Sequence, residues 1–261
     1  MKPKSYFYDI LLQLAGEQGI RLSPSMANSL ITYKHLLIAH NKNINLTSIT
    51  DPYEIILKHF IDSLFVIKFF NLQSPVIDIG TGAGLPGIPL SIVMPTISFT
   101  LVDTLQKRIN FLNSVKEQLQ LNNVIIIKGR SEDLAHDNEH NLKEICLRES
   151  FLTVVSRAVA PLYKLAELCL PFVIQGGIFI AYKGINTEDE VLQAKNAINA
   201  LGGSIEDIIK YKLPSINKSS NTVISQLKND ITHSLIIIRK TSPTSPLYPR
   251  KPNKIKNKPI L

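Results

Sequence analysis

Residues 76–87 read Val76-Ile77-Asp78-Ile79-Gly80-Thr81-Gly82-Ala83-Gly84-Leu85-Pro86-Gly87. An apolar run of strand type leads straight into four closely spaced glycines and then into the start of a helix. Glycine has no Cβ, so it lets the backbone turn sharply and approach a ligand, and the unpaired N–H groups of the next helix attract an anion or a carboxylate. The stretch therefore predicts a strand, a cofactor-binding loop and a helix in an α/β protein.

Two classes of cofactor fit this loop. Gly82-x-Gly84-x-x-Gly87 satisfies the dinucleotide fingerprint, and Asp103 lies about 20 residues further on, where an acid would bind the ribose. Asp78 instead favours S-adenosylmethionine, because it places a carboxylate at the end of the first strand, where nicotinamide-binding folds usually keep an apolar residue. A tight turn that binds no ligand is the less favoured alternative, since so many glycines weaken a turn more than folding requires.

Composition indicates an ordinary globular protein. A chain of 261 residues suits one catalytic domain with a modest addition, and 44% hydrophobic with 19% charged residues is typical of globular chains. The N-terminus lacks the apolar core of a signal peptide, and Cys146 and Cys169 lack metal-ligand spacing, so we expect a cytoplasmic protein without a metal. A net charge of +8 modestly favours a polyanionic partner.

The order of elements predicts a parallel sheet. Three helical patterns precede the loop, and strands then alternate with helices, which right-handed crossovers connect in parallel. Two late segments, 204–212 and 233–239, predict an antiparallel closing hairpin. The other expected strands are 75–80, 98–102, 123–128, 152–156 and 177–182, with helices at 87–94, 106–121, 161–172 and 187–201.

Three regions are expected along the chain. Residues 1–72 form a helical extension, residues 73–240 form the catalytic domain, and residues 241–261 form a disordered tail rich in proline and lysine. The polar connector 136–150 is predicted to be a surface insertion without a catalytic role.

Several motifs carry a resemblance to a known family. They are Asn45-Leu46-Thr47-Ser48, His59-Phe60-Ile61-Asp62-Ser63, residues 78–90, Asp103-Thr104-Leu105-Gln106-Lys107-Arg108, Ser156-Arg157-Ala158 and Lys183-Gly184. Together they resemble the ribosomal RNA small-subunit methyltransferase G family, also called the glucose-inhibited division protein B family. The resemblance runs from about residue 25 to residue 240, and its most specific part is Gly-Leu-Pro-Gly-Ile-Pro at 84–89. The connector 136–150 and the basic tail depart from the family pattern.

The resemblance implies both a fold and an activity. The fold is that of class I S-adenosylmethionine-dependent methyltransferases: Rossmann-like, with a mostly parallel seven-stranded sheet, an antiparallel C-terminal hairpin and here an N-terminal helical extension. The activity is transfer of a methyl group from S-adenosylmethionine to N7 of one guanine in 16S rRNA, with the small ribosomal subunit as partner, no membrane and no metal. We expect a monomer. Guanine N7 has a free lone pair at neutral pH, so alignment can replace a general base.

Cofactor contacts follow from the matching positions. Asp103 ends the second strand and would accept hydrogen bonds from the ribose hydroxyls, although it could instead cap the 106–121 helix. Ser131 and Glu132 follow the third strand, where the family places adenine, and they could equally cap a short helix. The loop residues that would shape the pocket for the methionine part and the ribose are Gly80, Thr81, Gly82 and Leu85.

Two cations are candidates for contact with the substrate or the transition state. Arg157 follows the fourth strand and could bind the cofactor carboxylate or an RNA phosphate, with an exposed arginine at a helix start as the alternative. Lys183 ends the fifth strand at the same edge. His59 and Asp62 lie three residues apart on one helix face and could hydrogen-bond each other or close over the cofactor, and a packed, structural role for His59 is equally compatible with the sequence.

The sequence is also compatible with other functions. The same cofactor residues would serve a methyltransferase that acts on a protein or a small molecule, and a nicotinamide-dependent oxidoreductase or a non-catalytic ribosome-binding module are further alternatives. If RNA is the substrate, scattered lysines and the tail would hold phosphate, and a splayed guanine would enter the pocket beside the cofactor.

Overall fold

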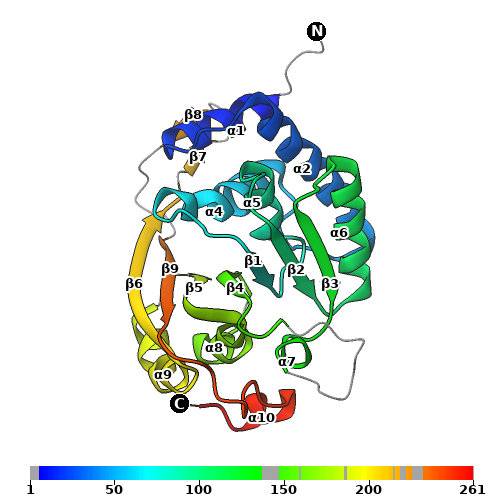
Figure 1. The fold of residues 1–261 in the computed structure, drawn as a ribbon. Helices are drawn as coiled ribbons and strands as arrows, with labels where there is room; N and C mark the ends of the chain where they lie inside the picture. Colours follow the sequence, from blue (N-terminus) through cyan, green and yellow to red (C-terminus); the bar gives the residue numbers. More distant parts are fainter. Residues whose placement is uncertain are drawn as a thin grey trace.

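A seven-stranded sheet with the order β3-β2-β1-β4-β5-β9-β6 forms the centre of the molecule (Figure 1). The structure is a computed structural model that describes residues 6–136, 147–158, 160–184, 187–213, 215–217, 222–224 and 232–260. Strands β1 to β5 are parallel, whereas β9 is antiparallel to both of its neighbours, β5 and β6. The expected parallel sheet with an antiparallel closing hairpin is confirmed. The strands are β1 (Val76–Ile79), β2 (Phe99–Asp103), β3 (Val124–Lys128), β4 (Phe151–Ser156), β5 (Val173–Lys183), β6 (Gly203–Lys212) and β9 (Thr232–Lys240), with a separate pair β7 (Ser215–Asn217) and β8 (Thr222–Ile224).

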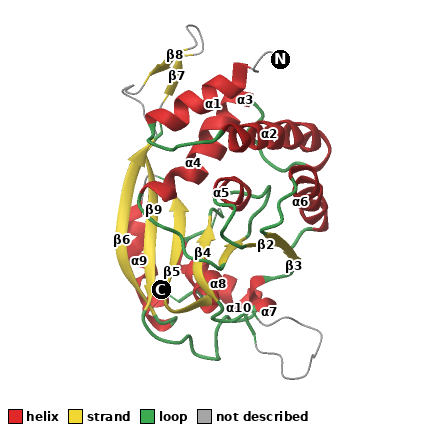
Figure 2. Cartoon of the chain, turned by 45° about the horizontal axis from the view of Figure 1, so that its top comes forward, coloured by secondary structure: helices red, strands yellow, loops and turns green. Residues whose placement is uncertain are grey.

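Helices cover both faces of the sheet (Figure 2). On β1, Val76 belongs to one apolar cluster with the N-terminal helices, α5 and α6, whereas Ile77 belongs to a second cluster with α8 and α9. This alternation follows from the period of two along a strand. The helices are α1 (Tyr6–Glu17), α2 (Pro24–Ile44), α3 (Pro52–Glu54), η1 (Ile55–Ile61), α4 (Asp62–Leu64), η2 (Phe65–Lys68), α5 (Gly87–Val93), α6 (Gln106–Leu119), α7 (Ser131–Leu134), α8 (Leu162–Cys169), η3 (Leu170–Phe172), α9 (Thr187–Ala200) and α10 (Pro252–Asn257).

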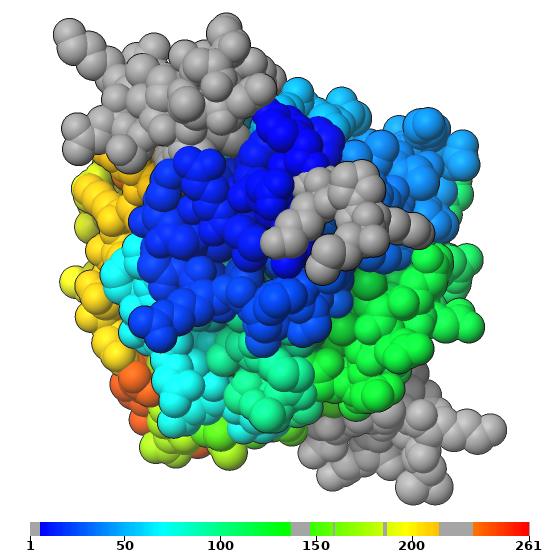
Figure 3. Space-filling model, turned by 90° about the horizontal axis from the view of Figure 1, so that it is seen from above, coloured from blue at the N-terminus to red at the C-terminus, as the bar shows by residue number. Residues whose placement is uncertain are grey.

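The N-terminal helices share a core with the sheet. Leu11, Leu14 and Leu30 are fully buried in the same apolar cluster as the strand residue Val76. Figure 3 looks down on α1 and α2 and shows them spread across that end of the molecule. No helix in the described parts of the chain is both long and apolar enough to cross a membrane.

The third helical segment contains an irregular turn. Asp51 caps its start by accepting hydrogen bonds from the N–H groups of Tyr53 and Glu54, and the helix then widens into a π-helical turn over Ile55–Ile61. Such turns are rare and are frequently found at functional sites. His59 lies inside this turn and Asp62 directly follows it.

The prediction of a disordered tail was wrong. Thr244 and Ile255 are buried, and residues 252–257 form α10. Arg250 binds Glu167 of α8 through its backbone N–H at 2.8 Å and through its guanidinium at 2.7 Å. Proline and lysine content indicated disorder, but the tail is held by an ion pair and hydrogen bonds with distant segments, which composition does not record.

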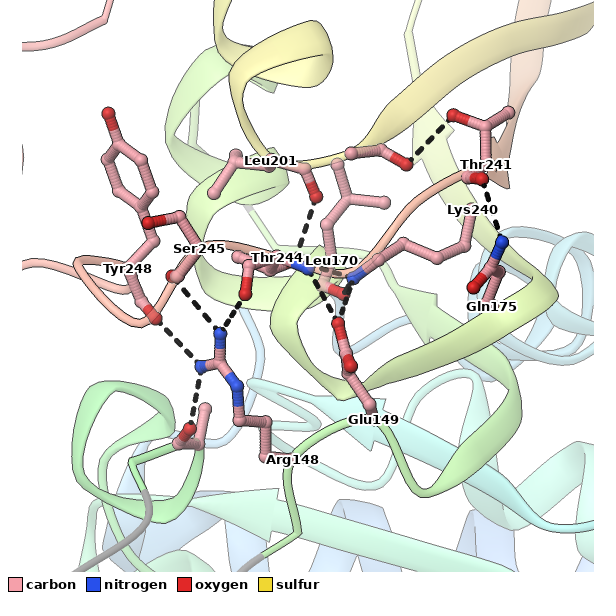
Figure 4. Close-up of polar contacts among 12 residues, drawn as sticks. Arg148, Glu149, Leu170, Gln175, Leu201, Lys240, Thr241, Thr244, Ser245 and Tyr248 are labelled. Carbon is pink, nitrogen blue, oxygen red and sulfur yellow. Dashed lines mark hydrogen bonds and ion pairs between the residues drawn. The ribbon is translucent and has the colours of Figure 1, made fainter.

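The connector 136–150 is only partly described, because residues 137–146 lie outside the described residues. Its last part is not a free surface insertion. Leu147 is buried, and Arg148 and Glu149 bind the tail (Figure 4).

Candidate active site

The glycine loop leaves β1 at Gly80 and is held from within by Asp78. One oxygen of this buried carboxylate accepts hydrogen bonds from Thr81 Oγ1 at 2.7 Å and from the Gly87 N–H at 2.9 Å. Its other oxygen, Oδ1, is buried and has no hydrogen-bond partner among the described residues. Burial raises the pKa of Asp78 to about 6. The half-paired carboxylate both shapes the loop and favours a cationic group nearby.

The four glycines of the loop have two different roles. A Cβ on Gly87 would lie 2.2 Å from Leu101 Cδ2, and Gly84 is similarly tight, so this pair lets the loop and α5 pack closely. Gly80 and Gly82 have φ angles of +71° and +61°, and a Cβ on either would meet no neighbouring group closer than 3.6 Å. The first two glycines therefore leave the backbone open to a ligand.

Thr81 and Leu85 turn their side chains inward. Both side chains are buried, Thr81 against Asp78 and Leu85 in the core shared with the N-terminal helices. Tyr33 of α2 also donates a hydrogen bond to the Ala83 carbonyl, which ties the helical extension to the loop. Thr81 and Leu85 can therefore contact a ligand only through their backbone atoms.

Asp103 stands at the end of β2, beside the loop. Its Oδ2 accepts hydrogen bonds from the Gly82 N–H at 3.0 Å and from Arg108 at 3.1 Å, and its Oδ1 accepts one from the Leu105 N–H at 2.9 Å. α6 begins after Leu105 without a side-chain cap, so the alternative of Asp103 as its N-cap is wrong. Because a carboxylate has about four acceptor positions, one remains open here.

Ser131 and Glu132 lie in α7, directly after β3. The Gly129 N–H donates to the Asp103 carbonyl, which places the start of this segment next to the end of β2. Ser131 is buried and its hydroxyl donates to the Glu132 carboxylate at 3.3 Å. The N-cap position belongs to Arg130 and carries no side-chain cap, so capping does not explain these two residues.

A pocket of about 680 Å³ opens next to the glycine loop. Ala158 lies in its wall, and it is the residue that a Cβ on Gly80 would approach. The charged and polar residues around the pocket come from the π-helical turn, the ends of β4 and β5, α9 and β9. They are Lys58, His59, Asp62, Arg157, Tyr182, Lys183, Glu190 and His233.

Asp62 binds two of these residues, Arg157 and His233, and also Tyr211 of β6. Its Oδ2 accepts a hydrogen bond from Arg157 at 3.0 Å, and its Oδ1 accepts one from the Tyr211 hydroxyl at 2.7 Å and one from His233 Nδ1 at 3.0 Å. Burial alone would raise the pKa of Asp62, but the hydrogen bond from His233 and the Arg157 guanidinium hold it below its usual value. Asp62 is therefore ionised and holds the Arg157 guanidinium at the pocket wall.

Arg157 is not an exposed residue at a helix start. Besides Asp62, its guanidinium donates to the Lys58 carbonyl at 2.8 Å and to His59 Nδ1 at 3.3 Å. A guanidinium can only donate, so Nδ1 of His59 accepts, and Nε2–H donates to Thr47 Oγ1 at 2.9 Å. Burial, with Arg157 nearby, lowers the pKa of His59 to about 4. His59 is neutral and does not bind Asp62 directly.

Lys183 ends β5 and also lines the pocket. Its ammonium group forms an ion pair with Glu190 of α9 at 2.6 Å and also donates to the Ala160 carbonyl. Glu190 in turn accepts the Leu162 N–H at the start of α8. Both candidate cations are therefore paired with acids in the structure.

Tyr211 and His233 were not predicted from the sequence. They lie on β6 and β9 and are opposite each other in the antiparallel register. The hairpin itself was predicted, and its register would have shown that these two residues are neighbours. Nothing in the local sequence links either of them to Asp62, which lies 149 residues before Tyr211.

Comparison with solved structures concerns the fold. A structure titled "Conversion of a Disulfide Bond into a Thioacetal Group during Echinomycin Biosynthesis" is similar with a TM-score of 0.51 and 14% identity, covering 69% of this chain and 81% of that chain. P. horikoshii TYW2 in complex with MeSAdo also has a TM-score of 0.51, with 11% identity over 69% of this chain and 62% of that chain. At these identities the likeness concerns the fold alone. The fold is that of the class I S-adenosylmethionine-dependent methyltransferases, as expected.

Sequence comparison defines the family. A family described as rRNA small subunit methyltransferase G matches residues 26–219. Proteins named "Ribosomal RNA small subunit methyltransferase G" from Clostridium botulinum and Desulforamulus reducens are both 44% identical to this chain, covering 97% and 96% of it and 99% and 97% of their own lengths. The chain belongs to the rRNA small subunit methyltransferase G family. The alignments with these relatives extend over most of the tail, whereas the family match ends at residue 219.

Proposed function

We propose that this protein transfers the methyl group of S-adenosylmethionine to N7 of one guanine in 16S rRNA, and that it does so in the cytoplasm as a monomer. Family membership supports the reaction class. The observation that carries the proposal is the position of the polar pocket, which adjoins the open glycines of the cofactor loop at the carboxyl ends of β1, β4 and β5. Ligands collect at this edge in open α/β sheets.

The residues around the loop fit the cofactor. The backbone at Gly80 and Gly82 would hold its methionine part, Asp103 would accept a ribose hydroxyl at its open position, and Ser131 and Glu132 would hold the adenine. The buried, half-paired carboxylate of Asp78 is complementary to a cationic ligand. The bound cofactor supplies an electrophilic methyl group.

The pocket would receive the guanine. Arg157 or Lys183 can donate a hydrogen bond to guanine O6, which is an acceptor that adenine lacks. Because each cation is paired with an acid, Asp62 or Glu190, neither pair carries a net charge. The pocket wall therefore does not repel the positive charge that develops on the guanine ring during methyl transfer. Neutral His59 has both ring nitrogens occupied and serves to orient Arg157.

Basic side chains at the pocket and on the tail would hold the RNA backbone. Lys58 lies at the pocket and is partly exposed. The ordered tail presents Lys251, Lys254 and Lys256 to solvent. Phosphate contacts of this kind supply affinity without base selection.

The test is label transfer from methyl-labelled S-adenosylmethionine to purified small ribosomal subunits, followed by mass-spectrometric mapping of the RNA. We expect one N7-methylguanine in 16S rRNA and its absence from cells that lack the gene. Asp103→Asn should weaken cofactor binding measured by calorimetry, whereas NAD should not bind to the wild type. Label in ribosomal protein, or binding of NAD in place of S-adenosylmethionine, would overturn the proposal.

A further inference from the structure

α7 is too short to hold its own position. It comprises four residues, and its internal bonds run from Asp133 and Leu134 to the Arg130 carbonyl and from Ala135 to the Ser131 carbonyl. Helix formation has a costly nucleus, so one turn in isolation is unstable in water. The orientation of Ser131 and Glu132 must therefore come from contacts with other segments.

The start of the segment is bonded to β2 and α7 packs against the apolar cluster of α8, while the end of α7 is held by residues 147–148 and by the C-terminal tail. The Leu147 N–H donates to the Leu134 carbonyl at 3.0 Å, and Arg148 donates to the Ala135 carbonyl at 3.1 Å. His136 Nε2 donates to the Pro249 carbonyl at 2.7 Å, because a carbonyl can only accept. The end of α7 is thus bonded both to the segment that leads into β4 and to the tail.

Arg148 joins α7 to the tail through one side chain. Besides Ala135, its guanidinium donates to the carbonyls of Tyr248 at 2.8 Å, Ser245 at 3.1 Å and Thr244 (Figure 4). All four partners are backbone oxygens, which the planar, five-donor guanidinium can serve together and a lysine cannot.

The tail is anchored independently of Arg148. Glu149 accepts hydrogen bonds from the Thr244 N–H at 2.7 Å and from the fully buried Lys240 at 3.0 Å (Figure 4). Further along, Arg250 pairs with the buried Glu167 of α8. Arg148 therefore holds α7 against a fixed part of the molecule.

We propose that Arg148 is a positioning residue for the cofactor site: with the tail at 244–249, it fixes α7 and so places Ser131 and Glu132 at the adenine end of the pocket. The inference rests on the proposed function, because it concerns the proposed adenine contacts. Arg148 itself touches neither reactant.

A pair of matched variants tests this role. Arg148→Met and Arg250→Met each remove a partly buried guanidinium that holds the tail in place, but only Arg148 is bonded directly to the end of α7. We expect both to lower the thermal midpoint. Arg148→Met alone should weaken S-adenosylmethionine binding by about tenfold, since a small displacement of a contact residue is costly. The inhibition constant of adenosine should rise by the same factor, while KM for small ribosomal subunits stays unchanged.

Several outcomes would decide against this role. Wild-type cofactor affinity in Arg148→Met, or an equal loss in Arg250→Met, would show that α7 does not depend on Arg148 specifically. If Arg148→Met does not fold, His136→Ala removes the other side-chain bond between the α7 end and the tail, and a severalfold weaker binding of adenosine is expected. Glu132→Ala separates the two proposals. If this variant binds adenosine as the wild type does, the proposed adenine contact is wrong. If it binds adenosine more weakly while Arg148→Met keeps wild-type affinity, only the positioning role of Arg148 is wrong.

Discussion

Asp62 shows how much of the pocket depends on single residues. Its carboxylate receives hydrogen bonds from Arg157, Tyr211 and His233, which lie on three different segments. The neutral His59 extends the same network to Thr47, in the loop that precedes the π-helical turn. A buried network of this kind is rigid when every member has a partner, and it is costly to break.

The neutral state of His59 predicts a pH dependence of stability. Its pKa in the folded protein is about 4, below the usual 6.5, so its contribution to stability is complete above pH 6.5 and is lost as the pH falls toward 4. We expect this group to remove about 2 kcal/mol from the free energy of unfolding between pH 7 and pH 5. Urea denaturation at the two pH values, in wild type and in His59→Gln, measures it.

The comparison with the variant is needed because Asp78 acts in the opposite direction. Its pKa is raised to about 6, so its charged form costs stability as the pH rises from 3.8 through 6. His59→Gln keeps this effect and should lose the one due to His59. Identical pH dependence in the two proteins would contradict a neutral, buried His59.

At the scale of elements, the strands and helices followed from the apolar pattern to within a few residues. The largest difference between a predicted and an observed boundary is in β5, which starts at Val173 instead of 177. The pairing with β4 is irregular around Gly176, so the first part of the strand lacks a regular strand pattern in the sequence. No local sequence pattern predicted that the tail packs against the domain. This packing depends on Arg148 and Glu167, whose partners lie about a hundred residues away in the chain.

Substitutions in the two pairs of loop glycines should have different effects on stability and on cofactor binding. Gly87→Ala places a Cβ 2.2 Å from Leu101, so we expect a loss of about 1–3 kcal/mol in the free energy of unfolding from overpacking. Gly82→Ala meets open space and should cost about 1–2 kcal/mol through its positive φ alone, while it weakens cofactor binding more than Gly87→Ala does.

Chemical denaturation and calorimetry on both variants separate stability from binding. Should Gly82→Ala bind S-adenosylmethionine as the wild type does, the open side of the loop would not face the ligand.

At the scale of the whole molecule, the mostly parallel sheet with its antiparallel hairpin and the family could be predicted, whereas the geometry of the pocket could not. The glycine motif and the alternation of strands and helices indicated the architecture. The pocket joins a π-helical turn, two strand ends and the last strand, and only the folded chain brings these together. Asp103 and Arg157 were singled out correctly as residues at the carboxyl edge, but their present partners, Arg108 and Asp62, were not foreseen.

The net charge of +8 predicts that RNA binding depends on salt. Every phosphate that the protein neutralises adds about 0.7–0.9 to the slope with which log affinity falls against log salt. With two or more such phosphates, binding to 16S rRNA should weaken by at least about tenfold between 50 and 200 mM salt. The affinity for S-adenosylmethionine should change little over this range. Filter binding and calorimetry at the two salt concentrations give both quantities, and an RNA affinity that ignores salt would argue against a phosphate-binding surface.

The place of β9 in the sheet has a consequence for biosynthesis. Because β9 lies between β5 and β6, neither strand has its final neighbour until residue 240 has been translated. A nascent chain that has emerged as far as β6 carries an open, apolar strand edge and lacks the fully buried residues Leu235–Ile238. Such edges invite pairing with other chains. Catalytic competence is thus acquired late in synthesis, and the growing polypeptide needs shielding until then.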